Sequence, residues 1–226
     1  MGVVLMCAAA VFTVFAQREV IQINDGWKFA VDKSAEGLAQ QWYLRPLPGA
    51  RLVNLPHTWN VEDDNQMHYG WGWYQKTIAV PAAWRSKNVV LEFRGVNHSS
   101  HIYINGRKAG ENIGDGFNKF FIDLNGKLDH GRDNTITVAV NNDYGKDKIP
   151  FANSFDWPND GGLIRPVSLI VTGKPFARYL HVTPTLDTAG GSGKLKIQLG
   201  LDPIVNKDPE LSVAVTEENQ QTENTV

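Results

Sequence analysis

The sequence predicts an all-β protein, built as a β-sandwich or a jelly roll. Apolar and polar residues alternate with a period of two along many short segments, as in strands that bury one face. Gly, Pro, Asn and Asp separate these segments at short intervals, which turns require. Only Ser34–Trp42 has a helical pattern, and it lacks a Glu or Gln three residues after its candidate cap. Many short strands and almost no helix are typical of sandwiches and jelly rolls.

The first sixteen residues, MGVVLMCAAAVFTVFA, form an apolar leader that ends in Val14-Phe15-Ala16, although no Lys or Arg precedes it. Compact side chains at this end suit a signal peptidase, so we expect a signal peptide over residues 1–16 and a secreted or periplasmic protein. A membrane anchor is the alternative, but a span needs about 20 apolar residues and Gln17 ends the run early. The mature chain should then have no membrane span. It should also lack thiols, because Cys7 is the only cysteine.

The first domain, expected over residues 17–173, contains a succession of predicted strands. In order they are Trp27–Val31, Tyr74–Val80, Val89–Phe93, His101–Ile104, Lys119–Asp123, Thr135–Val140 and Val167–Thr172. Directly after the fourth comes Asn105-Gly106, the pair favoured by type I′ turns because both residues take φ > 0. A tight hairpin is therefore predicted there.

A second unit is expected over residues 174–226. It contains three further predicted strands, Tyr179–Leu186, Lys194–Leu201 and Glu210–Thr216. An immunoglobulin-like sandwich needs about seven strands, so three do not close one. The sequence thus predicts a partial second β-sandwich.

Composition and motifs exclude several classes of function. The net charge is −2 and the basic residues are dispersed, which argues against a nucleic-acid partner. The six histidines show no His-Glu-x-x-His spacing, and no Gly-x-Ser-x-Gly sequence occurs. We therefore expect neither a metal site nor a cofactor nor a serine hydrolase.

Aromatic-rich loops are the most distinctive feature of the chain. Leu55–Asn60 leads into Glu62-Asp63-Asp64, and Phe155–Val167 contains Asp156 and Trp157. Such loops suit sugars, because an aromatic ring packs on the C–H face of a pyranose while carboxylates and amides bind its hydroxyls. The alternative is structural, with the acidic run a solvated turn. Four tryptophans are expected to serve packing instead: Trp27, Trp59, Trp73 and Trp84.

Taken together, these segments resemble the N-terminal region of glycoside hydrolase family 2, which includes β-galactosidases, β-glucuronidases and β-mannosidases. The likeness runs in the family's order from Val20 to Thr172. It rests on Asn54–Asn60, Gly72–Lys76, Leu91–Val96, Tyr103–Gly106, Phe117–Leu124, Asn134–Asn141 and Gly161–Leu169. No single one of these motifs is specific to the family, but their succession in this order is.

The resemblance implies a jelly-roll sugar-binding domain of the galactose-binding-like kind, then an immunoglobulin-like sandwich, then a (β/α)₈ barrel. In this family both catalytic carboxylates are barrel glutamates, the acid/base in an Asn-Glu dipeptide, and no Asn-Glu occurs here. The expected partners are thus a β-glycoside substrate and a catalytic barrel of the same polypeptide. We expect no catalytic residue in this chain and no hydrolysis by it alone.

The resemblance also implies which residues contact substrate. In β-galactosidases and β-glucuronidases of the family, an aspartate six positions before the Gly of a Gly-Ile-x-Arg motif binds sugar hydroxyls, and counting back from Gly162 gives Asp156. Trp157 lies beside it. A loop between Trp59 and Gly72 approaches the active site in some relatives, which adds three candidates, Asp63, Asp64 and Asn65. Alternatively, Asp156 caps a turn in a Trp-Pro loop.

Three functional hypotheses remain open on the sequence. The first is the front end of an exported exo-acting glycosidase, with β-galactosidase as the first guess. The second is a stand-alone carbohydrate-binding module, since jelly rolls bind sugars without chemistry. The third is a purely structural sandwich that touches no ligand.

Overall fold

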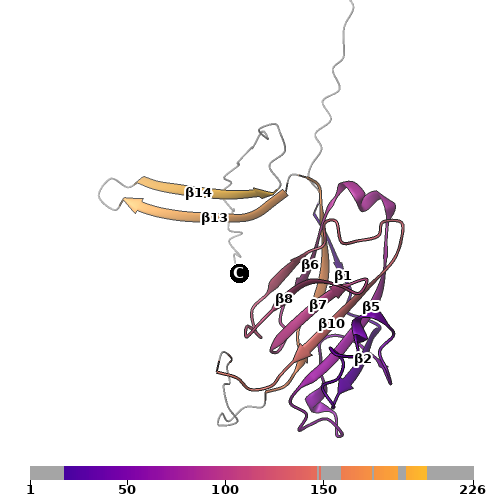
Figure 1. The fold of residues 1–226 in the computed structure, drawn as a ribbon. Coiled ribbons are helices and arrows are strands. Elements are labelled where there is room, and N and C mark those ends of the chain that lie inside the picture. Colours follow the sequence, from indigo (N-terminus) through magenta and orange to yellow (C-terminus); the bar gives the residue numbers. More distant parts are fainter. Residues whose placement is uncertain (1–17, 147, 149–158, 175, 188–191, 203–226) are drawn as a thin grey trace, which may run out of the picture. The chain divides into compact units, whose positions relative to one another are not determined.

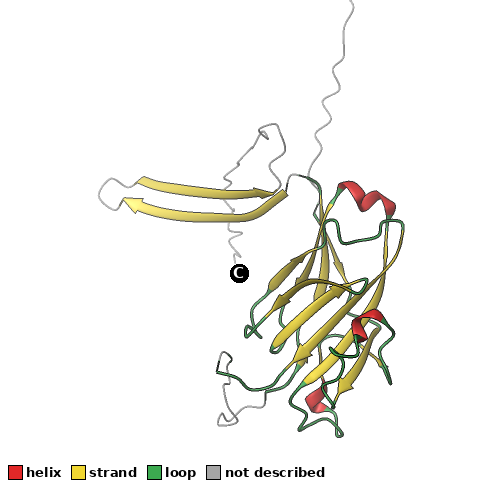
Figure 2. Cartoon of the chain, in the orientation of Figure 1, coloured by secondary structure: helices red, strands yellow, loops and turns green. Residues whose placement is uncertain are grey.

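The computed structural model describes residues 18–146, 148, 159–174, 176–187 and 192–202. Within these ranges the regular structure is β-strand apart from three short 3₁₀ turns (Figure 2). The predicted all-β fold class is therefore confirmed. The chain divides into two compact units between Lys174 and Pro175. No helix among the described residues is long and apolar enough to cross a membrane.

The first unit is a sandwich of two antiparallel sheets (Figure 1). The four-stranded sheet has the order β1-β12-β6-β9, and the six-stranded sheet has the order β3-β2-β5-β10-β7-β8. The smaller sheet contains β1 (Glu19–Gln22), β12 (Val167–Thr172), β6 (Asn88–Phe93) and β9 (Phe120–Asp123). The larger contains β3 (Arg51–Val53), β2 (Trp27–Asp32), β5 (Trp71–Val80), β10 (Arg132–Asn141), β7 (Ser99–Ile104) and β8 (Arg107–Asn112).

The seven strands predicted in this unit all occur, although β5 and β10 begin three residues earlier than predicted. The predicted hairpin joins β7 to β8, with φ of 50° at Asn105 and 77° at Gly106. Among the strands that the periodicity did not indicate, β8 has six residues, RKAGEN, without an alternating pattern, whereas others are very short, such as β4 (His57–Thr58) and β11 (Gly162–Leu163), which pair with each other. Two residues are too few to show a period of two.

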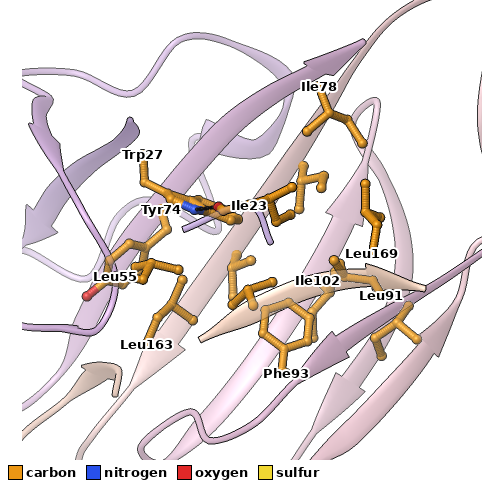
Figure 3. Close-up of a cluster of buried hydrophobic side chains, with 14 of the residues drawn as sticks. Ile23, Trp27, Leu55, Tyr74, Ile78, Leu91, Phe93, Ile102, Leu163 and Leu169 are labelled. Atoms are coloured by element: carbon orange, nitrogen blue, oxygen red, sulfur yellow. Dashed lines mark hydrogen bonds between the residues drawn. The ribbon is translucent and has the colours of Figure 1, made fainter. Parts of the chain in front are cut away.

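The hydrophobic core lies between the two sheets (Figure 3). Alternate residues of β6, β7 and β5 point into it, and four of them are 0% exposed: Leu91, Phe93, Ile102 and Tyr74. Burial of each such side chain contributes about 1.5–3 kcal/mol. Trp27, Trp59 and Trp73 are likewise fully buried, and Trp84 packs against the core at its margin. The three fully buried tryptophans are packing residues, as predicted, whereas Trp84 is only partly covered.

A second, smaller apolar cluster covers the outer face of the six-stranded sheet. Trp42 and Leu47, from the segment between β2 and β3, pack there against Ala30, Trp73 and Ala139. The large sheet is therefore buried on both faces over part of its area.

The prediction of a helix over Ser34–Trp42 is wrong. The segment forms turns, and 3₁₀ geometry appears only at Trp42–Leu44. Ala35 and Gln41 have φ of 55° and 54°, values that break a right-handed helix. The carboxylate of Asp32 accepts hydrogen bonds from the backbone N–H groups of residues 36 and 37, which fixes the first turn instead. Packing against the sheet overrides a weak helical pattern.

The described part of the second unit is one antiparallel hairpin. It consists of β13 (Phe176–Asp187) and β14 (Ser192–Asp202), with an irregular register between Ala177 and Tyr179. The third predicted strand, Glu210–Thr216, lies outside the described residues. The domain limits predicted from the sequence at 16, 173 and 226 remain predictions.

Candidate functional site

The loop that carries Asp63, Asp64 and Asn65 leaves the 3₁₀ turn η2 (Trp59–Val61) and returns to the sheet at β5. The loop lies beside the segment 159–163, because β4, the strand directly before η2, pairs with β11 in that segment. Trp59 N–H donates to the carbonyl of Gly161 over 3.3 Å, which extends this contact. The two stretches singled out from the sequence thus meet at one end of the sandwich.

Asn60 organises the loop through a single buried amide. Its Nδ2 donates to the carbonyl oxygens of Asn65, Gln66 and His68 over 3.3, 3.1 and 3.1 Å. Its Oδ1 accepts from the Gly161 N–H over 2.8 Å. One side chain therefore closes the loop on itself and ties it to the neighbouring segment.

Three further asparagines complete what we call the asparagine network, Asn60, Asn97, Asn142 and Asn159, all of which are buried. Asn142 Nδ2 donates to Asn60 Oδ1 over 3.2 Å and to the Asn159 carbonyl over 2.7 Å. Asn97 Nδ2 donates to Asn159 Oδ1 over 3.0 Å. Because residues 142 and 159 contact each other directly, the chain between them leaves and returns at one point. Asp156 and Trp157 belong to that stretch and lie outside the described residues.

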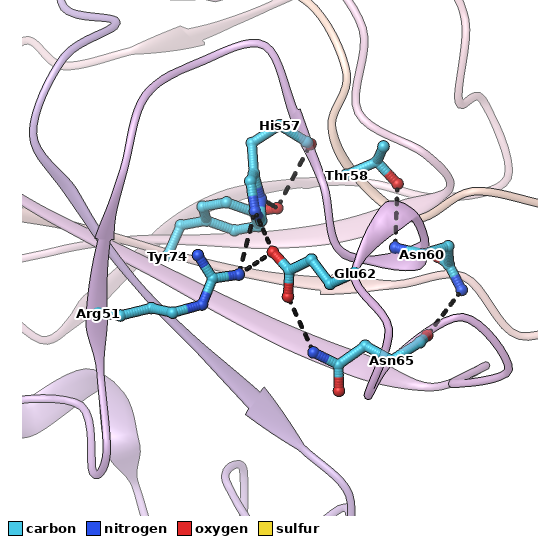
Figure 4. Close-up of polar contacts among 7 residues, drawn as sticks. All are labelled: Arg51, His57, Thr58, Asn60, Glu62, Asn65 and Tyr74. Carbon is cyan, nitrogen blue, oxygen red and sulfur yellow. Dashed lines mark hydrogen bonds and ion pairs between the residues drawn. The ribbon is translucent and has the colours of Figure 1, made fainter.

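A second polar cluster holds the start of the loop (Figure 4). The Glu62 carboxylate pairs with Arg51 and accepts a hydrogen bond from His57 Nε2 over 2.9 Å. His57 Nδ1 lies 2.7 Å from the Tyr74 hydroxyl. Since a carboxylate can only accept, Nε2 of His57 carries the proton and Nδ1 accepts from Tyr74.

Burial and then the Arg51 charge lower the pKa of His57 to about 4, so its imidazole is neutral at ordinary pH. Burial also raises the pKa of the Tyr74 hydroxyl. Both groups are held in their neutral forms, while Glu62 is paired with Arg51. This cluster is suited to positioning the loop and not to exchanging protons with a substrate.

The three predicted contact residues of the loop differ in what they can bind. Asp63 and Asp64 are exposed, and their carboxylates have no hydrogen-bond partner among the described residues. The Asn65 side chain is half-buried and donates to Glu62 Oε2 over 2.9 Å. The structure therefore leaves the two aspartates available to a ligand, while the Asn65 amide nitrogen is shared with Glu62.

No pattern in the sequence indicates that Glu62 positions the loop or that the four asparagines of the network meet. Asp160 is not marked by any pattern either; it is partly buried beside the network, and burial raises its pKa. Asn60 does lie within the Asn54–Asn60 motif, but asparagines are common in turns. No motif in the sequence contains Asn97 or Asn142, so neither could be recognised as a buried network residue. Within the described ranges, no group of three or more His, Cys, Asp or Glu could hold a metal ion.

Comparison with protein families decides what this sandwich is. The family model described as "Glycosyl hydrolases family 2, sugar binding domain" matches residues 62–173. Residues 62–173 belong to the family 2 sugar binding domain. The match begins at Glu62 and ends just after β12, so the family 2 domain includes the candidate loop and both ends of the stretch that carries Asp156.

Similar proteins are glycosidases that are much longer than this chain. A β-glucuronidase of Bacteroides fragilis is 31% identical over 161 residues, which cover 70% of this chain and 21% of that protein. A β-galactosidase of Thermoanaerobacterium thermosulfurigenes is 30% identical over 171 residues, covering 73% and 23%. The solved structure of a β-glucuronidase from an uncultured Clostridium sp. is 29% identical with a TM-score of 0.75, covering 85% of this chain and 35% of that one. The chain thus spans about a fifth to a third of these relatives.

Proposed function

We propose that this chain is the non-catalytic N-terminal portion of an exported family 2 glycoside hydrolase that cleaves O-glycosidic bonds in a barrel of the same polypeptide. The observation that carries the proposal is the family 2 domain at residues 62–173 in a chain that matches only 21% of a β-glucuronidase. Retaining glycosidases need two carboxylates about 5–5.5 Å apart, and the family's Asn-Glu dipeptide is absent from this sequence. The apolar leader at residues 1–16 supports export.

The role proposed for the sandwich is to supply sugar contacts from its rim. Asp156 and Trp157 are the leading candidates, followed by Asp63, Asp64 and Asn65. A carboxylate accepts from two sugar hydroxyls at once, and a tryptophan stacks on the pyranose ring. The asparagine network supports this role, because it fixes both rim segments at their bases.

A β-glucuronide is the substrate proposed first, ahead of the β-galactoside that was the first guess from the sequence. Two of the three similar proteins described above are β-glucuronidases, and one is a β-galactosidase. The β-galactoside therefore stays as the second candidate.

The test is to express the protein encoded by the complete reading frame and to assay it with p-nitrophenyl β-glucuronide and β-galactoside. We expect turnover of the glucuronide by that protein and none by residues 17–226 alone. Turnover by residues 17–226 would contradict a non-catalytic role. Preferential turnover of the galactoside would support the second candidate.

Asp156→Asn should lower kcat/KM of the complete enzyme more than tenfold if this carboxylate binds sugar hydroxyls in the transition state. The matched control is Asp133→Asn, an exposed aspartate at the far end of β10. An Asp156→Asn enzyme with unchanged kcat/KM would remove Asp156 from the site.

A further inference from the structure

A groove opens between the two sheets at the edge formed by β1 and the second half of β5. Its volume is about 540 Å³, within the range of about 300–1,000 Å³ typical of ligand sites. Residues that line it include Glu19, Ile21, Asp25, Lys76, Ile78 and Trp84. None of these residues takes part in the candidate site at the rim.

Among the described residues, two strands have no neighbour on the side of the groove. β1 is the edge of the four-stranded sheet as described and pairs there only with β12. β2 pairs with β5 only as far as Gln75, so Lys76–Val80 has a partner on the β10 side alone. The core is therefore accessible from the side at this edge.

The lining combines the groups that recognise a sugar. Ile21, Ile78 and Leu169 provide an apolar wall. Trp84, on the 3₁₀ turn η3 (Ala82–Ser86), is half-buried and lines the groove. An aromatic ring beside apolar groups suits the C–H face of a pyranose.

Charged groups border the same groove. The side chains of Glu19 and Asp25 are exposed, and Lys76 Nζ donates to the carbonyl of Asp25 over 2.5 Å. Two carboxylates accept hydroxyl hydrogens, and one ammonium group donates. With two negative charges against one positive charge, the groove disfavours an anionic ligand.

We propose that this groove binds a neutral pyranose oligosaccharide, with one ring stacked on Trp84 and hydroxyl groups bound by Glu19 and Asp25. A uronic acid is disfavoured by the two carboxylates. The inference goes beyond the proposed function, and it is tested by binding, without turnover. Its failure is therefore distinguishable from failure of the glycosidase proposal.

Isothermal titration of the whole chain with neutral hexasaccharides of xylose, mannose and galactose, and with a hexagalacturonate, tests the proposal. At least one neutral hexasaccharide should bind more tightly than the hexagalacturonate. Trp84→Ala should weaken that binding about tenfold, while Trp84→Phe, which keeps an aromatic face, should retain most of it. Binding of none of the neutral sugars, or tighter binding of the uronate, would overturn the proposal.

Two further variants separate recognition from folding. Phe121→Ala, at the opposite edge of the four-stranded sheet on β9, removes an exposed aromatic ring and should leave binding unchanged. Glu19→Gln should weaken binding several-fold without touching the core. Should Trp84→Ala unfold by circular dichroism, the Glu19→Gln and Trp84→Phe titrations decide the matter. An unchanged affinity of Glu19→Gln for the neutral hexasaccharide would then contradict binding in the groove.

Discussion

Single side chains determine the geometry of the rim. Asn60 uses both its donor and its acceptor atoms, and no other residue type offers an NH₂ group and a carbonyl on so short a stem. A buried polar group left without its partner costs about 1–3 kcal/mol, so the amides of Asn60, Asn142 and Asn159, which are partnered at both their nitrogen and their oxygen, are specified by their neighbours. This explains why these three asparagines, residues of low strand propensity, occupy buried positions here.

Asn60→Asp should lower the free energy of unfolding by about 3 kcal/mol or more, because a carboxylate would face three carbonyl oxygens that now accept from Nδ2. Urea denaturation of the two proteins measures the difference. Asn118→Asp is the control, since Asn118 is exposed and bonds only to Asp115. Equal losses of unfolding free energy in Asn60→Asp and Asn118→Asp would show that the fold does not require an amide at position 60.

His57 should make stability depend on pH. Its pKa is about 4 in the folded protein against about 6.5 when unfolded, so between these values only the unfolded chain binds the proton. Stability should fall as pH drops from 6.5 to 4. The gap in urea midpoint between the wild type and His57→Gln should therefore narrow over this window. A gap that stays constant from pH 7 to pH 4 would contradict the assigned pKa.

At the scale of elements, the short β4–β11 ladder joins the two rim segments. Gly162 makes this possible, since it has φ of 145° and any Cβ would lie 2.2 Å from the His57 carbonyl oxygen. A two-residue ladder has little stability of its own, so this close approach determines whether the segments stay together.

Gly162→Ala should cost roughly 3 kcal/mol or more in unfolding free energy, because the added methyl must displace backbone. Gly126→Ala is the matched control. That glycine also has a positive φ, 73°, but a Cβ there meets nothing within 4 Å, so only about 1 kcal/mol is expected. Thermal unfolding of both variants gives the comparison, and similar losses would mean that backbone conformation alone matters at Gly162.

At the scale of the whole molecule, the chain combines a two-sheet sandwich with a second unit whose described part is a single hairpin. Tyr179, Leu180, Val182, Leu186 and Leu195 of β13 and β14 are 45–72% exposed. A two-stranded hairpin is marginally stable in water, and exposed apolar strands invite association.

The whole chain should therefore self-associate, whereas a chain that ends at Lys174 should remain monodisperse. Light scattering of both proteins at equal concentration measures this. A second comparison, Leu180→Lys in the whole chain, should reduce association if the hairpin causes it. Equal monodispersity of the whole and shortened chains would contradict the argument.

Local patterns predicted most of the strands, because a strand with one buried face repeats every two residues and needs no knowledge of its partner. The Asn105-Gly106 turn followed from backbone conformation alone. The error at Ser34–Trp42 arose because Asp32, just before the segment, fixes its first turn, and because the contact of Trp73 with Gly37 comes from a distant position in the chain. Asp63 and Asp64 became candidate substrate contacts through the family resemblance. The hydrogen bonds by which Asn60 and Glu62 hold their loop could not be predicted in the same way.

The sequence by itself determined the fold class, the strand order along the chain and the family, since each depends on residue type and spacing. Only the tertiary structure decided which asparagines are buried together, which charges His57 meets and where the sandwich stays open beside β1. These features join residues far apart in the sequence, such as Asn60 and Gly161, which are 101 positions apart, and no local pattern records such a contact. Hydrogen bonds at that separation exist only after both sheets have packed.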